Sequence, residues 1–140
     1  MPTYSLVEVI KVFVIALPVF ALIDYIWLAH LAKNFYLTSL APLIRVENGS
    51  LVVNFGGAAV VYLIGVLAII LFVDPAHKTP GQALVTGALF GFVMYAFYDF
   101  TNYATLHGFP LKLALIDTLW GTFLFAIVSA ITAWVLSVWK

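Results

Sequence analysis

Four long apolar stretches are the feature of this sequence that most limits what the chain can fold into. They cover residues 6–31, 51–73, 82–106 and 111–139. About 20 consecutive apolar residues are enough for a helix to cross the hydrocarbon core of a bilayer, and each stretch reaches that length. Because a backbone in lipid must satisfy its own polar groups, each stretch is expected to be helical. The sequence therefore predicts an all-α membrane protein, a four-helix transmembrane bundle forming a single domain over residues 1–140.

Composition excludes several other classes of protein. Hydrophobic residues make up 65% of the chain and charged residues only 9%, whereas soluble domains carry about 25% charged residues. The lipid bilayer is therefore the expected partner, and because the formal net charge is zero, we expect no nucleic acid. The chain has no cysteine, which excludes disulfides, thiolate metal sites and cysteine nucleophiles. Any function must lie within the membrane.

The connections between the stretches are short, and the longest covers residues 33–50. We expect an interfacial loop there, whose stretch 34–40 is apolar enough to lie as a short surface helix and to act as a lid. Pro18 lies inside the first stretch and predicts a bend rather than an end of the helix. Thr79 is expected to cap the third helix, with Pro80 as its first residue.

Three aspartates inside the apolar stretches need an explanation: Asp24, Asp99 and Asp117. A charged aspartate at the centre of a membrane helix costs about 2.5 to 3.5 kcal/mol on insertion scales. Each lies six or seven residues from the end of its stretch, or about 10 Å at the rise of an α-helix, and on the same side of the membrane. We therefore predict that the first, third and fourth helices bring the three carboxyl groups into one pocket.

Further polar and aromatic residues are predicted to join this pocket. A stripe about 100° wide on the third helix holds Tyr95, Tyr98, Asp99 and Asn102. Asn54 enters the second helix from the same side, while Trp27 and Trp120 would add aromatic faces. The candidate residues for binding a proton or ligand are Asp24, Trp27, Asn54, Tyr95, Tyr98, Asp99, Asn102, Asp117 and Trp120.

Small residues indicate which helices pack closely. Gly87 and Gly91 form a G-x-x-x-G pattern on the third helix, and Gly121 follows Asp117 by one turn on the fourth. Glycine lets two helix backbones approach each other closely in a membrane. The third and fourth helices are therefore expected to pack tightly.

The leading functional hypothesis is that the pocket binds a proton or a small cationic or polar ligand, in a carrier or a sensor. Acidic residues that face the interior of a bundle are typical of such pathways. Aromatic faces recognise cations, and protonation of an aspartate cancels its charge. Proton binding and ligand binding would then compete.

Two alternatives stay open. In the first, the protein is a membrane-embedded enzyme acting on a lipid or isoprenoid, with Asp99 and Asp117 as general acid and base or as joint ligands of a divalent metal. The sequence has no D-D-x-x-D, H-E-x-x-H or Ser-His-Asp signature to support it. In the second, the protein is an assembly subunit whose polar residues only fix the packing of the helices. The sequence identifies neither a cofactor nor a metal site.

Charge does not fix the orientation. Three Lys or Arg residues fall on each side of the membrane: Lys11, Lys78 and Lys140 on one, and Lys33, Arg45 and Lys112 on the other. Topology follows this balance, so both orientations stay open. An antiparallel homodimer would fit, as in the small multidrug-resistance carriers, which this chain resembles in size and charge balance only. Pairing of Glu8 with Lys11 would favour a cytoplasmic first loop.

Two segments carry the motifs of a known family. The first has D-Y-I-W-L at 24–28, then Phe35-Tyr36 and Leu40; the second has Y-D-F-T-N-Y-A-T-L at 98–106, then Gly108, Pro110-Leu111, Ile116-Asp117 and Trp120-Gly121. In order and spacing these resemble the small bacterial membrane proteins grouped as domain of unknown function 2177. The resemblance implies a bacterial inner-membrane protein of four helices and implies nothing about a substrate.

Overall fold

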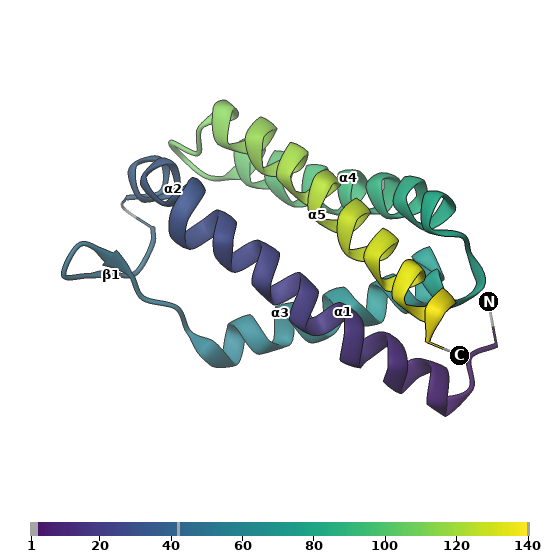
Figure 1. The fold of residues 1–140 in the computed structure, drawn as a ribbon. Coiled ribbons are helices and arrows are strands. Elements are labelled where there is room, and N and C mark those ends of the chain that lie inside the picture. The colour runs from purple at the N-terminus through teal and green to yellow at the C-terminus, as the bar shows by residue number, and fades with distance from the viewer. Residues whose placement is uncertain (1–2, 42, 140) are drawn as a thin grey trace.

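The computed structural model describes residues 3–41 and 43–139, which are mostly helical (Figure 1). Within these residues, four helices are long and apolar enough to cross a membrane: Leu6–Leu31, Phe55–Val73, Pro80–Thr105 and Leu111–Val138. The protein is therefore an all-α membrane protein, as the sequence predicts.

The first transmembrane helix consists of α1 (Leu6–Ile26) and a π-helical turn, η1 (Trp27–Leu31). Ser5 caps the start of this helix. The Ser5 hydroxyl accepts a hydrogen bond from the backbone N–H of Glu8, and the Glu8 carboxylate accepts one from the backbone N–H of Ser5 at 2.8 Å. This reciprocal cap satisfies two backbone donors that a helix start leaves free. The helix continues through Pro18, as predicted.

Glu8 and Lys11 do not pair with each other among the described residues, so the predicted pairing is wrong. The Glu8 carboxylate serves the cap at Ser5 and lies 3.6 Å from His77 Nε2. Lys11 Nζ instead donates to the backbone carbonyl of Trp139 at 3.2 Å. Each side chain therefore has a partner other than the one predicted. The number of Lys and Arg residues on the two sides of the membrane stays equal.

A short helix and a hairpin follow the first transmembrane helix. The predicted surface helix is present as α2 (Lys33–Ser39), and it packs against Phe109 and Leu113 where the chain turns into the last helix. Strands β1 (Val46–Glu47) and β2 (Ser50–Leu51) then pair antiparallel.

The second transmembrane helix begins at Phe55, four residues later than the predicted start at 51. The hairpin explains the difference, because Asn48 and Gly49 turn the chain with positive φ angles of 50° and 72°, a backbone typical of tight two-residue turns. Asn54 then caps α3 (Phe55–Ala68), which continues as the π-helical turn η2 (Ile69–Val73). A 3-10 turn, η3 (Pro75–His77), leads to the next helix.

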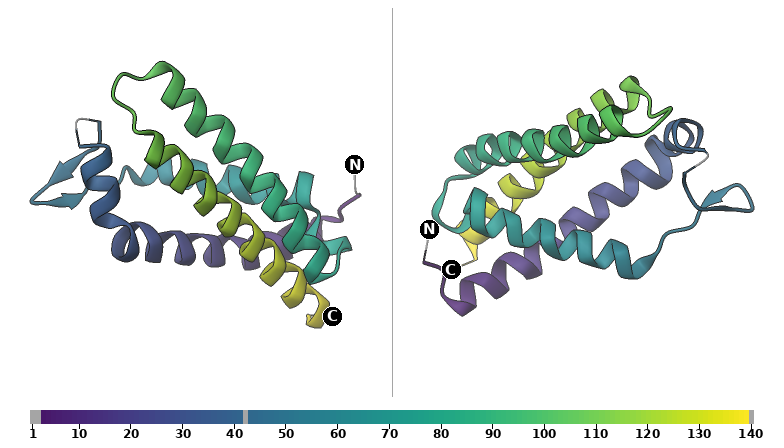
Figure 2. Two further views of the ribbon diagram at one scale, coloured as in Figure 1. Left: turned by 90° about the horizontal axis from the view of Figure 1, so that it is seen from above. Right: turned by 180° about the vertical axis from the view of Figure 1, so that it is seen from behind.

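The last two helices, α4 (Pro80–Thr105) and α5 (Leu111–Val138), lie side by side and antiparallel (Figure 2). Thr79 caps α4, as predicted. A Cβ atom on Gly91 would lie 2.3 Å from the carbonyl oxygen of Gly121, and one on Gly87 would lie 2.5 Å from that of Phe125. No other residue type allows so close an approach, which confirms the tight packing of these helices.

The apolar core joins α1, α3, η2 and α5. Its fully or nearly fully buried residues include Val12, Ala16, Phe20, Val66, Ile69, Val73, Leu124 and Val128. On the other side of this core, toward the hairpin, α3 diverges from α1 (Figures 1 and 2).

Candidate functional site

Asp24 joins three transmembrane helices. It lies on α1 and is half-buried. The Tyr62 hydroxyl of α3 donates to Asp24 Oδ2 at 2.9 Å, and Trp120 Nε1 of α5 donates to Asp24 Oδ1 at 3.1 Å. Each carboxylate oxygen thus has one donor, and an intramembrane carboxylate is satisfied from two neighbouring helices.

A second set of contacts connects Asp117 with the surface helix. The Trp27 ring stacks on the Trp120 ring with centroids 4.3 Å apart. Trp27 Nε1 donates to the Tyr36 hydroxyl at 3.2 Å, and that hydroxyl donates to Asp117 Oδ1. The indole, phenol and carboxyl groups therefore form a continuous polar path from α2 into the bundle.

Burial affects Tyr36 strongly, since its hydroxyl lies under α2. Desolvation raises the pKa of Tyr36 well above its usual value, and the negative charge of Asp117 raises it further. The phenol therefore keeps its proton at any physiological pH and acts as a donor to Asp117.

Asp99 is the most deeply buried of the three aspartates. Only 1% of its surface is exposed, and neither carboxyl oxygen has a hydrogen-bond donor among the described residues. The Asp117 carboxyl group is a near neighbour of it across the interface between α4 and α5. Two carboxyl groups form a hydrogen bond only when one of them carries a proton. A hydrogen bond between Asp99 and Asp117 would therefore need one proton on the pair.

Tyr95 lies near the three aspartates. Its ring packs against Gly121, where an added Cβ atom would lie 2.0 Å from the ring. Its hydroxyl lies within electrostatic range of all three carboxyl groups. Gly121, on the same helix as Asp117, thus makes room for the Tyr95 ring.

The structure brings most of the nine candidate residues together, but not all of them. Asn102 is half-buried on the inward face of α4. Tyr98 is 63% exposed and points out of the bundle, because α4 is covered on one side only and the predicted stripe is wider than that side. Asn54 is exposed. Its side-chain carbonyl oxygen caps α3 by accepting a hydrogen bond from the backbone N–H of Gly57 at 3.0 Å. These two lie outside the site.

Sequence reasoning missed two phenols, Tyr36 and Tyr62. Tyr62 stands alone in an aliphatic run, and a phenol in such a run usually has a hydrogen-bond partner when buried. That isolation is the signal that could have found it. Tyr36 belongs to a family motif, but nothing in its spacing shows that it reaches Asp117.

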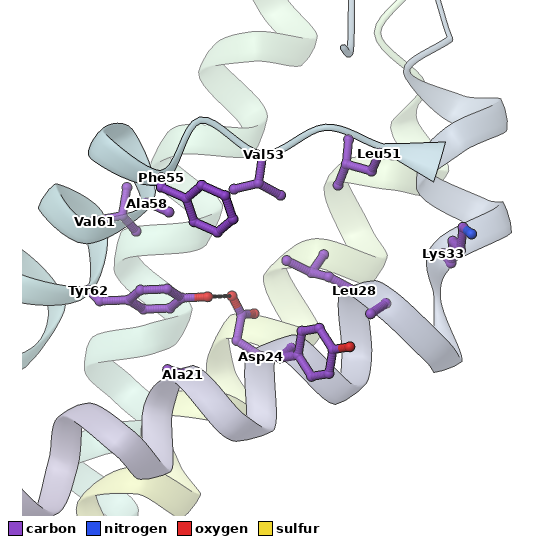
Figure 3. Close-up of a pocket in the computed structure, with 12 residues that line it drawn as sticks. Ala21, Asp24, Leu28, Lys33, Leu51, Val53, Phe55, Ala58, Val61 and Tyr62 are labelled. Carbon is purple, nitrogen blue, oxygen red and sulfur yellow. Dashed lines mark hydrogen bonds between the residues drawn. The ribbon is translucent and has the colours of Figure 1, made fainter. Parts of the chain in front are cut away.

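A pocket of about 630 Å³ lies between α1 and α3, and Asp24 lines it together with Tyr62 (Figure 3). Most of the remaining lining is apolar. Of the three aspartates, Asp24 is the one found among the described residues that line this pocket.

The family described as "predicted membrane protein (DUF2177)" matches residues 9–134. The chain belongs to this family. The match includes the three aspartates and the phenols of Tyr36 and Tyr62. Of the transmembrane helices, it leaves out only the first residues of α1 and the last residues of α5. No curated protein and no solved structure matches the chain. This DUF2177 protein is a multi-pass membrane protein, and its family carries no assigned activity.

Proposed function

We propose that this DUF2177 protein binds a proton or a small cationic or polar ligand, as a carrier or sensor in the bacterial inner membrane. The site is the carboxyl cluster, by which we mean Asp24, Asp99 and Asp117. The observation that carries the proposal is Asp99, a buried carboxyl group without a donor among the described residues and beside a second carboxyl group.

Electrostatics explains why this arrangement favours a bound proton. An uncompensated buried charge is strongly unfavourable, and a second negative charge beside it adds repulsion. A proton between Asp99 and Asp117 removes one charge and supplies the missing hydrogen bond. When the proton leaves, a cation compensates the charge instead. Proton binding and cation binding therefore compete at the carboxyl cluster.

The path through Tyr36 supports exchange of the proton with the membrane surface. Tyr36 lies on α2, outside the transmembrane helices, and donates to Asp117. A hydroxyl group both donates and accepts, so it passes a proton along a chain of hydrogen bonds. Trp27 holds this hydroxyl in place from the π-helical turn η1.

Infrared spectroscopy of the protein in lipid nanodiscs tests the shared proton at neutral pH. The wild-type protein is expected to show the C=O band of a protonated carboxyl group in a dry environment. Asp99→Asn is expected to lose the band, because the new amide donates to Asp117 in place of the proton. Glu47→Gln, in the exposed hairpin, is the control and should keep it. A wild-type protein without the band contradicts the proposal.

The geometry favours binding over the rival lipid or isoprenoid enzyme. General acid and base chemistry by Asp99 and Asp117 needs a substrate beside both groups. The pocket between α1 and α3 reaches Asp24 instead.

A further inference from the structure

The pocket between α1 and α3 has the size of a ligand site. We call it the wedge, and it is lined by residues within 21–33 of the first helix and its continuation and within 51–62 of the hairpin and α3. Its volume of about 630 Å³ lies within the usual range for pockets that hold small organic molecules. Figure 3 shows the side chains of the two helices facing each other across it.

Charge is distributed unequally along the wedge. Its two charged lining residues are Asp24 and Lys33. Asp24 lies on α1 at the inner end beside Tyr62, and Lys33 begins α2, toward the first loop (Figure 3). Among the described residues Lys33 forms no ion pair with Asp24, so the inner end carries the negative charge.

Asp24 keeps acceptor capacity that the protein does not use. Its two oxygens accept one hydrogen bond each, from Tyr62 and Trp120, while an ionised carboxylate accepts about four. Asp24 is half-buried and lines the wedge. A ligand in the wedge that carries a positive charge would meet this free capacity directly.

The walls of the wedge suit an apolar body with a cationic centre. Aliphatic residues such as Leu28 and Val61 line it, together with the rings of Tyr25, Phe55 and Tyr62. Aromatic faces attract cations, most strongly where water is excluded. The wall thus combines apolar contact for a hydrophobic body with attraction for a positive charge.

The wedge opens toward the bilayer. Two residues of its walls on the transmembrane helices, Tyr25 and Val61, are 58% and 62% exposed. Because both lie within helices that cross the membrane, their exposed surfaces face lipid chains. A ligand that enters here comes laterally and must dissolve in the bilayer.

We propose that the wedge binds a lipophilic cation, an ammonium or phosphonium centre on an apolar body, with the charge at Asp24. An anion is repelled from the inner end, and a neutral alkane leaves the carboxylate uncompensated. This inference rests on the proposed function and deepens it by naming the class of ligand. Asp24 is thereby the ligand-binding member of the carboxyl cluster, and Asp99 with Asp117 holds the proton.

Binding of radiolabelled tetraphenylphosphonium to the protein in phosphatidylcholine nanodiscs tests the proposal. Wild-type protein is expected to bind it saturably. Asp24→Asn, which removes the charge, and Ala58→Phe, which fills the wedge, should each weaken binding at least tenfold. Ala59→Phe adds the same ring one residue along, on an exposed position outside the lining, and should bind as the wild type does. Circular dichroism and gel filtration confirm that each variant is folded.

Two outcomes overturn the proposal: saturable binding that Ala58→Phe leaves unchanged, or tetraphenylborate, an anion of the same shape, binding as tightly as the cation. Either result leaves the infrared band of Asp99 unaffected, so the proposed proton site would stand. Conversely, a wild-type protein that binds the cation through Asp24 but lacks the band contradicts the proton site alone. The two proposals therefore fail separately.

Discussion

At the residue scale, hydrogen bonds from phenols hold the carboxyl cluster in place. Tyr62 donates to Asp24 from α3, and Tyr36 donates to Asp117 from α2. In lipid no water replaces a lost donor. The phenols therefore contribute to stability as well as to the proposed binding of a proton.

Tyr62→Phe is expected to lower the free energy of unfolding by about 1 to 3 kcal/mol, because it removes one of the two donors to Asp24. Tyr98→Phe makes the same chemical change at an exposed position and should stay within about 0.5 kcal/mol. Unfolding in mixed detergent micelles, followed by tryptophan fluorescence, measures both. Equal effects of the two variants would contradict the structure around Asp24.

The positions of Asp24, Asp99 and Asp117 along their helices could be predicted from the sequence, because the spans are set by their apolar stretches and helix rise is constant. The hydrogen-bond partners of these aspartates could not be predicted, because they depend on how each helix is rotated about its axis. A soluble helix reveals its buried face by its polar residues, but α3 is apolar on all sides. The isolation of Tyr62 in its aliphatic run indicates a hydrogen-bond partner, but nothing in the pattern of α3 identifies that partner as Asp24.

At the scale of elements, the pairing of α4 with α5 is the firmest part of the bundle. Glycines bring the two backbones into contact at Gly87, Gly91 and Gly121. This contact also places Asp99 beside Asp117 and makes room for the Tyr95 ring. The G-x-x-x-G pattern predicted the pairing, because small residues at helical spacing leave a groove on the helix surface that a second backbone can fill.

Gly91→Ala is expected to destabilise the protein by about 2 to 3 kcal/mol, since the new Cβ atom forces two backbones apart. Gly81→Ala is the control within the same helix, because a Cβ atom there meets nothing within 4 Å. It should be neutral or slightly stabilising. Thermal unfolding in detergent compares the two, and a stable Gly91→Ala protein would contradict the tight helix pair.

At the scale of the whole molecule, the bundle is closed around α5 and open between α1 and α3. The opening could not be predicted, because apolar side chains face lipid and protein alike in a membrane. We propose in addition that the chain forms a homodimer. Because equal numbers of Lys and Arg residues lie on the two sides of the membrane, the two copies can be antiparallel. Cross-linking in native membranes that yields only monomers would contradict this.

Proton release on cation binding shows most directly whether the proton and the cation compete at the carboxyl cluster. Tetraphenylphosphonium is added to the protein in lightly buffered nanodiscs near neutral pH, with a pH indicator dye. If the two compete, about one proton should leave for each cation bound. Asp99→Asn should bind the cation and release none. Saturable binding to the wild-type protein without any release of protons would contradict the competition.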